Sequence, residues 1–289
     1  MILATRPPVS VVVPFVGDRQ ALERLSSYLR CLEFRLGDEL IVSDNTRDGI
    51  NRGVVAENIH VVRAAAERSS YHARNAGARA AANDWLLFMD ADCRPVPHLL
   101  DCYLPTRPPD RCGAIAGAVI GRPDQAALIA RYARARGFLN LAGGGEGPGW
   151  RIAVAGNVLV RRAAFNAIGG FTEGIRSGGD VDFSRRLQRA GWSIDSRPAA
   201  LVEHRHRERL IPFLATIARY AAGSRWLNRR YPGHSPRWPL TKQFALSGRD
   251  AVAFASRGNP EEAVFRVLDG LGLVAHNVGY LGANSARSG

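Results

Sequence analysis

The sequence is poor in cysteine and lysine and has no long apolar run. Four cysteines are too few for a disulfide scaffold in a chain of 289 residues. The sequence also contains no CxxC pair, so a zinc ribbon is not expected. We expect all four to be small buried side chains: Cys31, Cys93, Cys102 and Cys112. The first apolar run is short and contains Pro14, so we expect neither a secretory signal nor a membrane span. These absences favour a cytoplasmic protein, either free or at the inner face of the membrane.

The composition also excludes several protein classes. With 46% hydrophobic and 22% charged residues, the chain is neither collagen, nor disordered, nor a coiled coil. Lys242 is its only lysine, yet 39 basic residues against 26 acidic ones give a net charge of +13. This excess favours anionic partners such as nucleotide phosphates or acidic lipids. Nucleic acid is not expected, because no aromatic platform or known motif accompanies the arginines.

The hydrophobic pattern predicts an α/β fold. Short β-branched or apolar runs alternate with amphipathic helical patterns through the first half, which is typical of βαβ units and an open, mostly parallel sheet. After Arg207 the pattern is helical. The predicted strands span residues 9–15, 39–43, 58–63, 85–89 and 112–121, and the predicted helices span 19–34, 69–83, 126–141, 210–230 and 261–280.

A glycine-rich segment, GGGEGPG at residues 143–149, lies between a predicted helix and a strand and is followed by Trp150. Glycine imposes little conformational preference, so the segment is either a plain flexible connection or an active-site flap. Its position favours the flap.

The sharpest chemical signal is Asp90-Ala91-Asp92, directly after the apolar run WLLFM. The carboxyl ends of parallel strands are where open α/β sheets bind ligands. Carboxylate oxygens there can hold a hard divalent cation, which can in turn hold a diphosphate. A second polar group, Ser43-Asp44-Asn45, follows the second strand. It either caps the next element or supplies a carboxylate, Asp44, that accepts the ring N–H of a nucleotide base.

Three further groups carry candidate chemistry. Arg74 opens a helix of small residues and can bind diphosphate oxygens. Asp180 and Asp182 begin a later helix, where a carboxylate either caps the helix or takes a proton from an attacking hydroxyl. His204 and His206 follow a short apolar strand and are either surface residues or metal ligands.

The order of these motifs resembles one family. VVVPF, SDN, HARNAGARAA, FMDADC, AGNVLVRR, GGF, GGDVDFSRRLQRAGW and VEHRH follow one another as in the family 2 inverting nucleotide-sugar glycosyltransferases of the GT-A fold. The resemblance covers residues 9–207. It implies a Rossmann-like catalytic domain at 1–207, with a nucleotide-sugar part at 1–95 and an acceptor part at 110–207. Residues 208–289 would form a helical extension packed on that domain or on a membrane.

The resemblance also implies roles for single residues. Asp92 is the expected direct ligand of Mn²⁺ or Mg²⁺, with Asp90 beside it and either His204 or His206 completing the site. Asp180 is the expected catalytic base. The resemblance also implies the residues that bind the donor. Some pack against the nucleoside, one carboxylate accepts a hydrogen bond from the base, an arginine and an aspartate lie at the diphosphate, and a later segment lies beside the sugar. These residues are Pro14, Phe15, Asp44, Arg74, Asp90, Gly156 and Asn157.

Two positions depart from the family pattern. Ser43 stands where many members carry a first aspartate, which would leave base recognition to Asp44. Gly179 replaces the glutamate of a Glu-Asp pair, which leaves Asp180 as the base, Asp182 as the alternative, and extra room for the acceptor.

The implied reaction is metal-dependent transfer of a sugar from a nucleoside diphosphate sugar, with UDP expected, to an acceptor hydroxyl by single displacement with inversion. The acceptor is a glycan, a lipid-linked intermediate or a small metabolite. The alternatives are a non-catalytic sugar-nucleotide-binding protein of the same fold and a sugar nucleotidyltransferase. A glycine-poor segment after the first strand, Val16–Arg19, counts against the nucleotidyltransferase.

Overall fold

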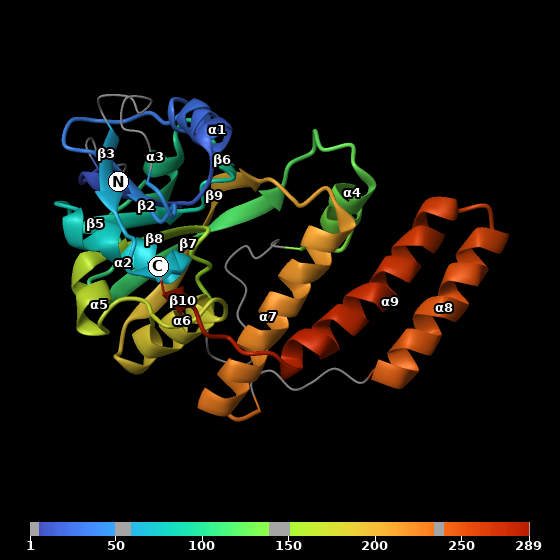
Figure 1. Ribbon diagram of the computed structural model, residues 1–289. Coiled ribbons are helices and arrows are strands. Elements are labelled where there is room, and N and C mark those ends of the chain that lie inside the picture. Colours follow the sequence, from blue (N-terminus) through green and yellow to red (C-terminus); the bar gives the residue numbers. More distant parts are fainter. Residues whose placement is uncertain (1–5, 50–58, 139–150, 234–239, 289) are drawn as a thin grey trace.

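The computed structural model describes residues 6–49, 59–138, 151–233 and 240–288 and consists of a sheet with helices on both faces and a helical arm (Figure 1). The strands are β1 Val9–Phe15, β2 Glu39–Asp44, β3 Ile59–Arg63, β4 Glu67–Arg68, β5 Trp85–Met89, β6 Cys93–Pro95, β7 Cys112–Gly121, β8 Asn157–Arg161, β9 Ser193–His204 and β10 Arg287–Ser288. The helices are α1 Arg19–Leu29, α2 Ser70–Ala80, α3 Leu99–Tyr103, α4 Leu128–Ala135, α5 Arg162–Ala167, α6 Gly179–Arg189, α7 Leu210–Arg230, α8 Leu240–Ser256 and α9 Pro260–Leu281.

Eight strands form one sheet in the order β3-β2-β1-β5-β8-β7-β9-β6. The first four are parallel, β8 is antiparallel to both its neighbours, and β7 is parallel to β9. The expected mostly parallel α/β sheet is therefore confirmed. The short pair β4–β10 forms a separate two-stranded ladder.

The central strands β2, β1, β5, β8 and β7 are buried on both faces, as their continuous apolar runs require. Leucines of α1 and α3 pack on one face together with alternate side chains of β1, such as Val11 and Val13. Side chains of α2, α5 and α6 cover the other face, where Phe88, Phe165 and Phe171 pack ring against ring.

A third cluster joins α4 to the arm. Tyr132 of α4 packs edge-on against Phe213 of α7 and Phe265 of α9. Figure 1 shows α7, α9 and α8 in a row, with α8 farthest from the sheet. Among the described helices, none is long and apolar enough to cross a membrane.

Three expectations about elements need correction. The first helix ends at Leu29 rather than at 34, and the described helix α4 ends at Ala135. Helix α8 was not expected, because its pattern of single polar residues and a mid-helix glycine gives a weak helical signal. The expected flap at 143–149 lies outside the described residues.

Candidate active site

The candidate site lies where β1, β2 and β5 end side by side. In the ladder between β1 and β2, Phe15 is the partner of Asp44, and β5 runs parallel on the other side of β1. Asp90 and Asp92 follow the last residue of β5. The chain therefore brings the expected base reader and the acidic pair to one edge of the sheet.

Asp44 is buried and already has partners. Its carboxylate binds the guanidinium of Arg63 at 2.9 Å and accepts the Thr46 N–H at 2.9 Å. Ser43 points the other way, where a Cβ at Gly77 would touch its hydroxyl. No sequence motif singled out Arg63. It ends the edge strand β3, and no local pattern indicates that its side chain reaches Asp44 on the neighbouring strand β2.

The two residues before this edge differ in depth. Pro14 is half-buried, whereas Phe15 is buried in the core under α1. A side-chain contact between Phe15 and a nucleoside, as the resemblance implied, is therefore not available in this structure. Pro14 remains the predicted apolar contact for a nucleoside at that place.

Asp90, Asp92 and His204 come together although His204 is more than a hundred residues away in the sequence. The pairing of Cys93 with His204 in the β6–β9 ladder places His204 beside Asp92, with Nε2 3.2 Å from Oδ1. One ligand atom from each of the three lies within 4.8 Å of the others. This set of two carboxylates and one imidazole suits a divalent cation such as Mn²⁺.

Asp92 and His204 each shift the pKa of the other toward its charged form. Burial alone would lower the pKa of His204, but the Asp92 carboxylate raises it above the usual value. Burial alone would raise the pKa of Asp92, but His204 lowers it. Asp92 is therefore an ionised carboxylate at neutral pH, as a metal ligand must be.

His206 does not belong to this group. Its backbone N–H and C=O bind the side-chain amide of Gln125, and its ring points at Gly121 rather than at the carboxylates. Burial, and then the neighbouring His204, lowers the pKa of His206 to about 4. Of the two histidines, His204 is thus the candidate ligand.

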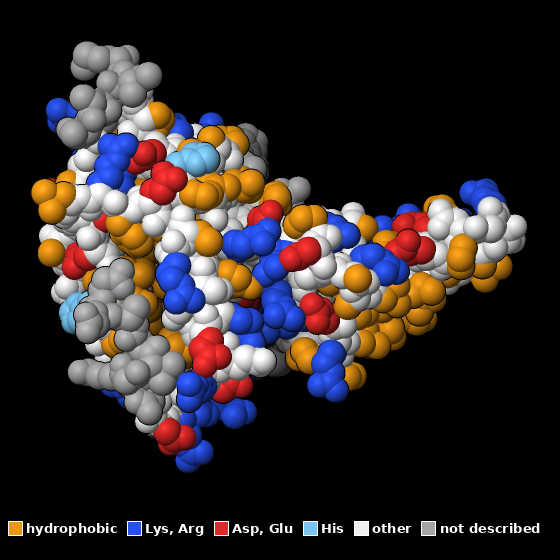
Figure 2. Space-filling model, turned by 90° about the horizontal axis from the view of Figure 1, so that it is seen from above, with side chains coloured by type: hydrophobic (Ala, Val, Ile, Leu, Met, Phe, Trp, Pro, Cys, Tyr) orange, Lys and Arg blue, Asp and Glu red, His pale blue; other side chains and the backbone are white. Residues whose placement is uncertain are grey.

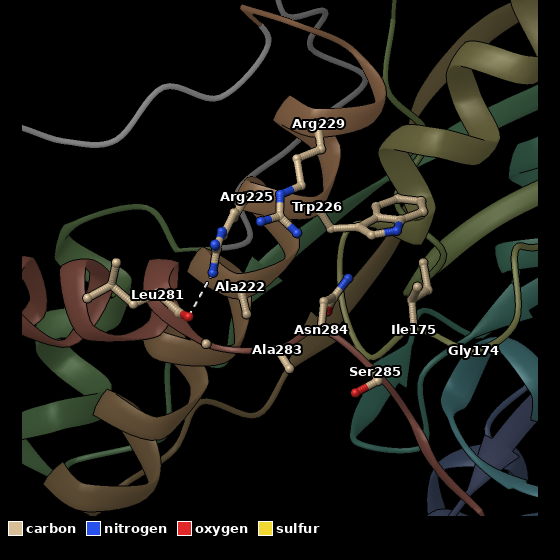
Figure 3. Close-up of a pocket in the computed structure, with 11 residues that line it drawn as sticks. Gly174, Ile175, Ala222, Arg225, Trp226, Arg229, Leu281, Ala283, Asn284 and Ser285 are labelled. Atoms are coloured by element: carbon tan, nitrogen blue, oxygen red, sulfur yellow. Dashed lines mark hydrogen bonds between the residues drawn. The ribbon is translucent and has the colours of Figure 1, made fainter.

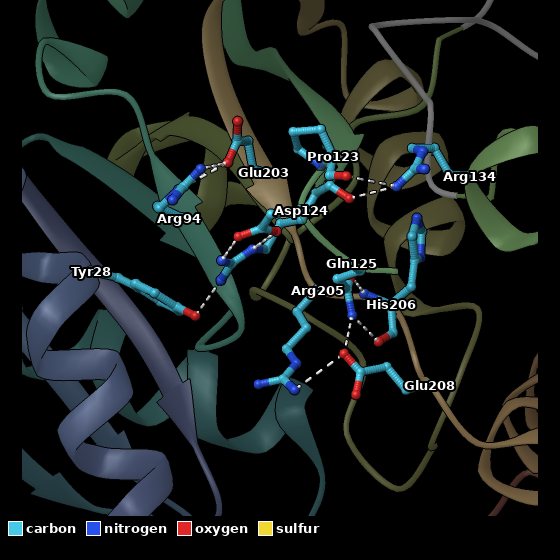
Figure 4. A network of polar contacts seen from close by, with 11 residues as sticks. Tyr28, Arg94, Pro123, Asp124, Gln125, Arg134, Glu203, Arg205, His206 and Glu208 are labelled. Atoms are coloured by element: carbon cyan, nitrogen blue, oxygen red, sulfur yellow. Dashed lines mark hydrogen bonds and ion pairs between the residues drawn. The ribbon is translucent and has the colours of Figure 1, made fainter. Parts of the chain in front are cut away.

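Figure 4 shows what holds the chain that follows His204. Gln125 also donates to Glu208, which accepts from Arg205 at 3.3 Å. On the preceding strand Glu203 binds Arg94 of β6. These contacts fasten β9 to β6 and to the segment after β7, and so fix the position of His204.

Arg74 lies beside the acidic pair. It is buried in α2 and forms an ion pair with Asp90, and its guanidinium lies 5.7 Å from the Tyr71 ring centre. Burial would lower the pKa of Arg74, but the carboxylates of Asp90 and Asp180 raise it, so the positive charge is permanent.

Asp180 stands in the first turn of α6. One carboxylate oxygen accepts the Ala155 N–H at 3.3 Å, and the other is buried with no hydrogen-bond partner among the described residues. Burial raises the pKa of Asp180, against the charge of Arg74, and Asp90 raises it further. A carboxylate with a raised pKa and an unused oxygen can accept a proton.

Asp182 cannot serve as the alternative base in this structure. It is fully buried, and one oxygen accepts from Thr172 at 2.6 Å and from Arg186 at 2.8 Å. The other oxygen accepts from Tyr231 at 2.7 Å and lies 2.8 Å from the Arg230 Nε. Burial would raise the pKa of Asp182, but these hydrogen bonds lower it. Asp182 ties α6 to the end of α7 instead.

Gly179 gives no extra room, contrary to the expectation. The ring of Tyr71 fills the space: a Cβ at Gly179 would lie 2.6 Å from it. The Gly179 N–H, one of the unpaired donors of the first turn of α6, donates to the Tyr71 hydroxyl at 3.0 Å. Tyr71 therefore supports the helix turn that carries Asp180, a role that no sequence motif indicated.

Gly156 and Asn157 differ in what they can do. A Cβ at Gly156 would lie 3.1 Å from the Asp90 carboxylate, so the backbone runs close to the acidic pair. Asn157 is buried with every polar atom paired. Its amide accepts from Tyr103 and donates to the carbonyls of Ala118 and Ala200. Asn157 thus joins strands and does not face a donor, contrary to the expectation.

Helix α7 lies beside the site. Tyr220 is 40% exposed; its partial burial raises the pKa of the phenol, and the carboxylates of Asp90, Asp180 and Asp92 add to the effect. One turn later Gly223 packs against Ser177, just before α6. Helix α7 therefore packs against the start of α6, the helix that carries Asp180.

A separate cavity of about 400 Å³ opens between α7 and the end of the chain (Figure 3). Arg225, Trp226 and Arg229 line it from α7, and Asn284 and Ser285 line it from the C-terminal segment. It is lined by none of the residues expected to bind the donor, metal or acceptor proton.

Comparison with known proteins adds the following. The model of the family described as Glycosyl transferase family 2 matches residues 10–169. The chain is 29% identical over 242 residues to the pre-mycofactocin glycosyltransferase of Mycobacterium tuberculosis, which covers 78% of this chain and 50% of that protein. It is 24% identical over 199 residues to glycosyltransferase AglE of Haloferax volcanii, which covers 66% of this chain and 64% of that protein. The chain thus spans about half the length of the mycobacterial relative.

Solved structures show the same fold. The mannosyltransferase PcManGT from Pyrobaculum calidifontis, in complex with GDP-Man and Mn²⁺, matches with a TM-score of 0.62 at 18% identity, over 96% of this chain and 88% of that one. Glucosyl-3-phosphoglycerate synthase from Mycobacterium tuberculosis, in complex with Mn²⁺, UDP-glucose and glycerol 3-phosphate, matches with a TM-score of 0.50 at 19% identity, over 77% and 80%. The expected GT-A fold is therefore confirmed.

Proposed function

The chain belongs to glycosyl transferase family 2, and from that membership we propose that it transfers a sugar from a nucleoside diphosphate sugar to an acceptor hydroxyl. The observation that carries the proposal is the meeting of Asp90, Asp92 and His204 at the same sheet edge as Arg74 and Asp180. An acidic metal site, a permanent cation and a free carboxylate oxygen are the groups this reaction needs.

Asp90, Asp92 and His204 would hold the divalent cation. Once bound, a cation such as Mn²⁺ or Mg²⁺ offsets the negative charge that builds on the leaving diphosphate. Two similar solved structures are complexes with Mn²⁺, which supports this choice of cofactor. Asp90 also holds Arg74, whose Nε has no hydrogen-bond partner among the described residues.

Arg74 would supply fixed positive charge to the diphosphate. It is buried and its charge is secured by two carboxylates, so little reorganisation is needed when the leaving group develops its charge. Asp180 would take the proton of the acceptor hydroxyl as that oxygen attacks. A single attack from the face opposite the leaving group inverts the anomeric centre.

The donor base would lie between Pro14 and Asp44, with UDP as the expected nucleotide. The Asp44 carboxylate is held by Arg63 and by the Thr46 N–H, so its orientation is fixed before a base arrives. The acceptor would enter along α7, beside Tyr220. A glycan, a lipid-linked intermediate and a small metabolite are the acceptor classes to be tested.

The first experiment is calorimetric titration of the full chain with UDP, GDP and dTDP, each with and without Mn²⁺. We expect one nucleotide to bind in a Mn²⁺-dependent manner and Asp92→Ala to abolish this dependence. Asp110→Ala is the matched control, because its exposed carboxylate forms an ion pair with Arg107 on the surface. Equal binding in EDTA would overturn the metal site, and binding without any turnover of the matching sugar nucleotides would indicate a non-catalytic binding protein.

A further inference from the structure

Helix α9 leaves a stripe of apolar side chains uncovered. Val264, Val267, Val274 and Val278 are 40, 52, 39 and 65% exposed. Leu271, which is partly buried, lies between them, so the spacing along the helix alternates between three and four residues. Residues at this spacing lie on one side of a helix.

Helix α8 continues this surface. A Cβ at Gly270 of α9 would lie 3.4 Å from the ring of Phe244, while Arg266 lies over the ring of Phe254 at 5.3 Å. The two contacts orient α8, and helical geometry then places Phe244 and Val252, which are 49 and 71% exposed, on the same side as the α9 stripe. Figure 2 shows the continuous hydrophobic surface along the arm. We call this surface the arm face.

The opposite side of the arm is charged, and its carboxylates bind α4. Asp269 accepts from Tyr132 and Arg136 of α4, and Glu262 binds Arg136 and Arg266. The arm face therefore looks away from the rest of the chain. Of the described side chains of α8, only Ala251 is buried. A helix of 17 residues with so little burial is weakly held, so a partner that covered its open face would stabilise the arm.

Charge distinguishes between partners. Residues 240–281 carry four basic side chains and four acidic ones, a net charge of zero, so the +13 of the chain lies outside this helix pair. Helices that lie on anionic membranes are rich in Lys and Arg on their polar side. The arm lacks that excess, and the residues of its apolar stripe carry no charge that would repel an identical surface.

We propose that the arm face pairs with the arm face of a second copy of this chain, related by a two-fold axis. Alternating spacings of three and four residues are those of helices that interlock side by side. About 25 Å of shared helix length and about 20 Å of width give roughly 500 Å² per copy, or about 1,000 Å² in total. That area reaches the lower limit of specific interfaces.

The test is sedimentation equilibrium of the full chain over a range of micromolar concentrations. We expect a monomer–dimer equilibrium, and we expect Val267→Glu to raise the dissociation constant roughly a hundred-fold or more, because it places a charge in an apolar contact. Leu36→Glu is the matched control. It introduces the same charge at a fully exposed leucine of the catalytic domain, and the dimer should be unchanged.

Circular dichroism checks that Val267→Glu folds, and Val278→Glu provides an independent variant on the same stripe. A wild-type chain that sediments as a monomer at every concentration overturns the proposal. So does a dimer that both variants leave intact. Flotation with phosphatidylcholine vesicles, with and without phosphatidylglycerol, tests the lipid alternative: a monomer that binds vesicles and loses binding in Val267→Glu assigns the arm face to membrane instead.

Discussion

At the residue scale, two aspartates two residues apart on α6 have opposite surroundings. Asp180 keeps an oxygen without a hydrogen-bond partner among the described residues, whereas both oxygens of Asp182 are saturated. The first arrangement suits proton transfer and the second suits anchoring. Both residues lie in the first turn of α6, so their sequence context alone gave no reason to separate them.

Conservative changes at Asp180 and Asp182 should therefore impair different properties: transfer at Asp180 and stability at Asp182. Asp180→Asn should keep donor affinity and stability but lower transfer by about 10²–10⁴-fold, as loss of a general base does. Asp182→Asn should lower the free energy of unfolding by about 3 kcal/mol, because it leaves two arginines without their buried counter-charge. Donor titration, turnover and urea unfolding of both variants distinguish the two roles. Transfer at the parent rate in Asp180→Asn would show that another group is the base.

The pH dependence follows from the direction of the Asp180 shift. Burial raises its pKa above that of an ordinary aspartate, and a base works only when it is deprotonated. Transfer should therefore fall, as pH decreases, at a higher pH than an exposed aspartate would cause. The folded state also binds this proton more tightly than the unfolded chain does, so ionisation of Asp180 costs stability as pH rises through its pKa. A pH profile of transfer tests this, and an acid limb at the ordinary aspartate value would contradict it.

The residue types in the sequence predicted the chemistry of side chains better than they predicted whether those side chains are buried. The acidic pair and Asp180 could be found because an acidic residue after an apolar strand or at a helix start has few roles. Phe15 and Asn157 were assigned to the donor, but both are buried, and Asn157 uses all its hydrogen-bonding capacity on β7, β9 and Tyr103. Burial depends on which elements pack together, and that information is not local.

At the element scale, the close approach of α7 and α9 depends on a glycine. A Cβ at Gly279 would overlap the backbone of Ala218, which cannot rotate away. Gly279→Ala should therefore force the helices apart and lower the free energy of unfolding by about 1–3 kcal/mol. Urea unfolding measures it.

Gly248→Ala is the matched control on α8, because no atom lies within 4 Å of a Cβ there. It should leave stability unchanged or raise it by up to about 1 kcal/mol through better helix propensity. Equal losses in both variants would mean that the contact between Gly279 and Ala218 does not hold the two helices together.

Element order was more predictable than element contact. Alternating periodicities indicated the strands and helices of the first half, and the parallel sheet followed from them. The pairing of β6 with β9, which brings His204 to Asp92, joins a three-residue strand to one that begins a hundred residues later. No local pattern marks such a ladder, so the choice between His204 and His206 stayed open in the sequence.

At the scale of the whole molecule, the positive charge is unevenly distributed. Residues 240–281 are neutral, so the rest of the chain carries the excess. Anionic nucleotide sugars should be attracted over several ångströms before they bind. Donor affinity should therefore fall several-fold as NaCl rises from about 0.05 to about 0.5 M, since the screening length shrinks in that range. Titration at three salt concentrations tests this, and affinity that does not change with salt would show that short-range contacts alone bind the donor.

The contact between Tyr71 and Gly179 also restricts how the protein can evolve. A side chain larger than hydrogen at position 179 collides with the ring, so a glutamate there is accessible only after position 71 has lost its aromatic ring. Losing the ring first would remove the hydroxyl that holds the Gly179 N–H. Either single step passes through a damaged intermediate. The two positions should therefore change together or not at all.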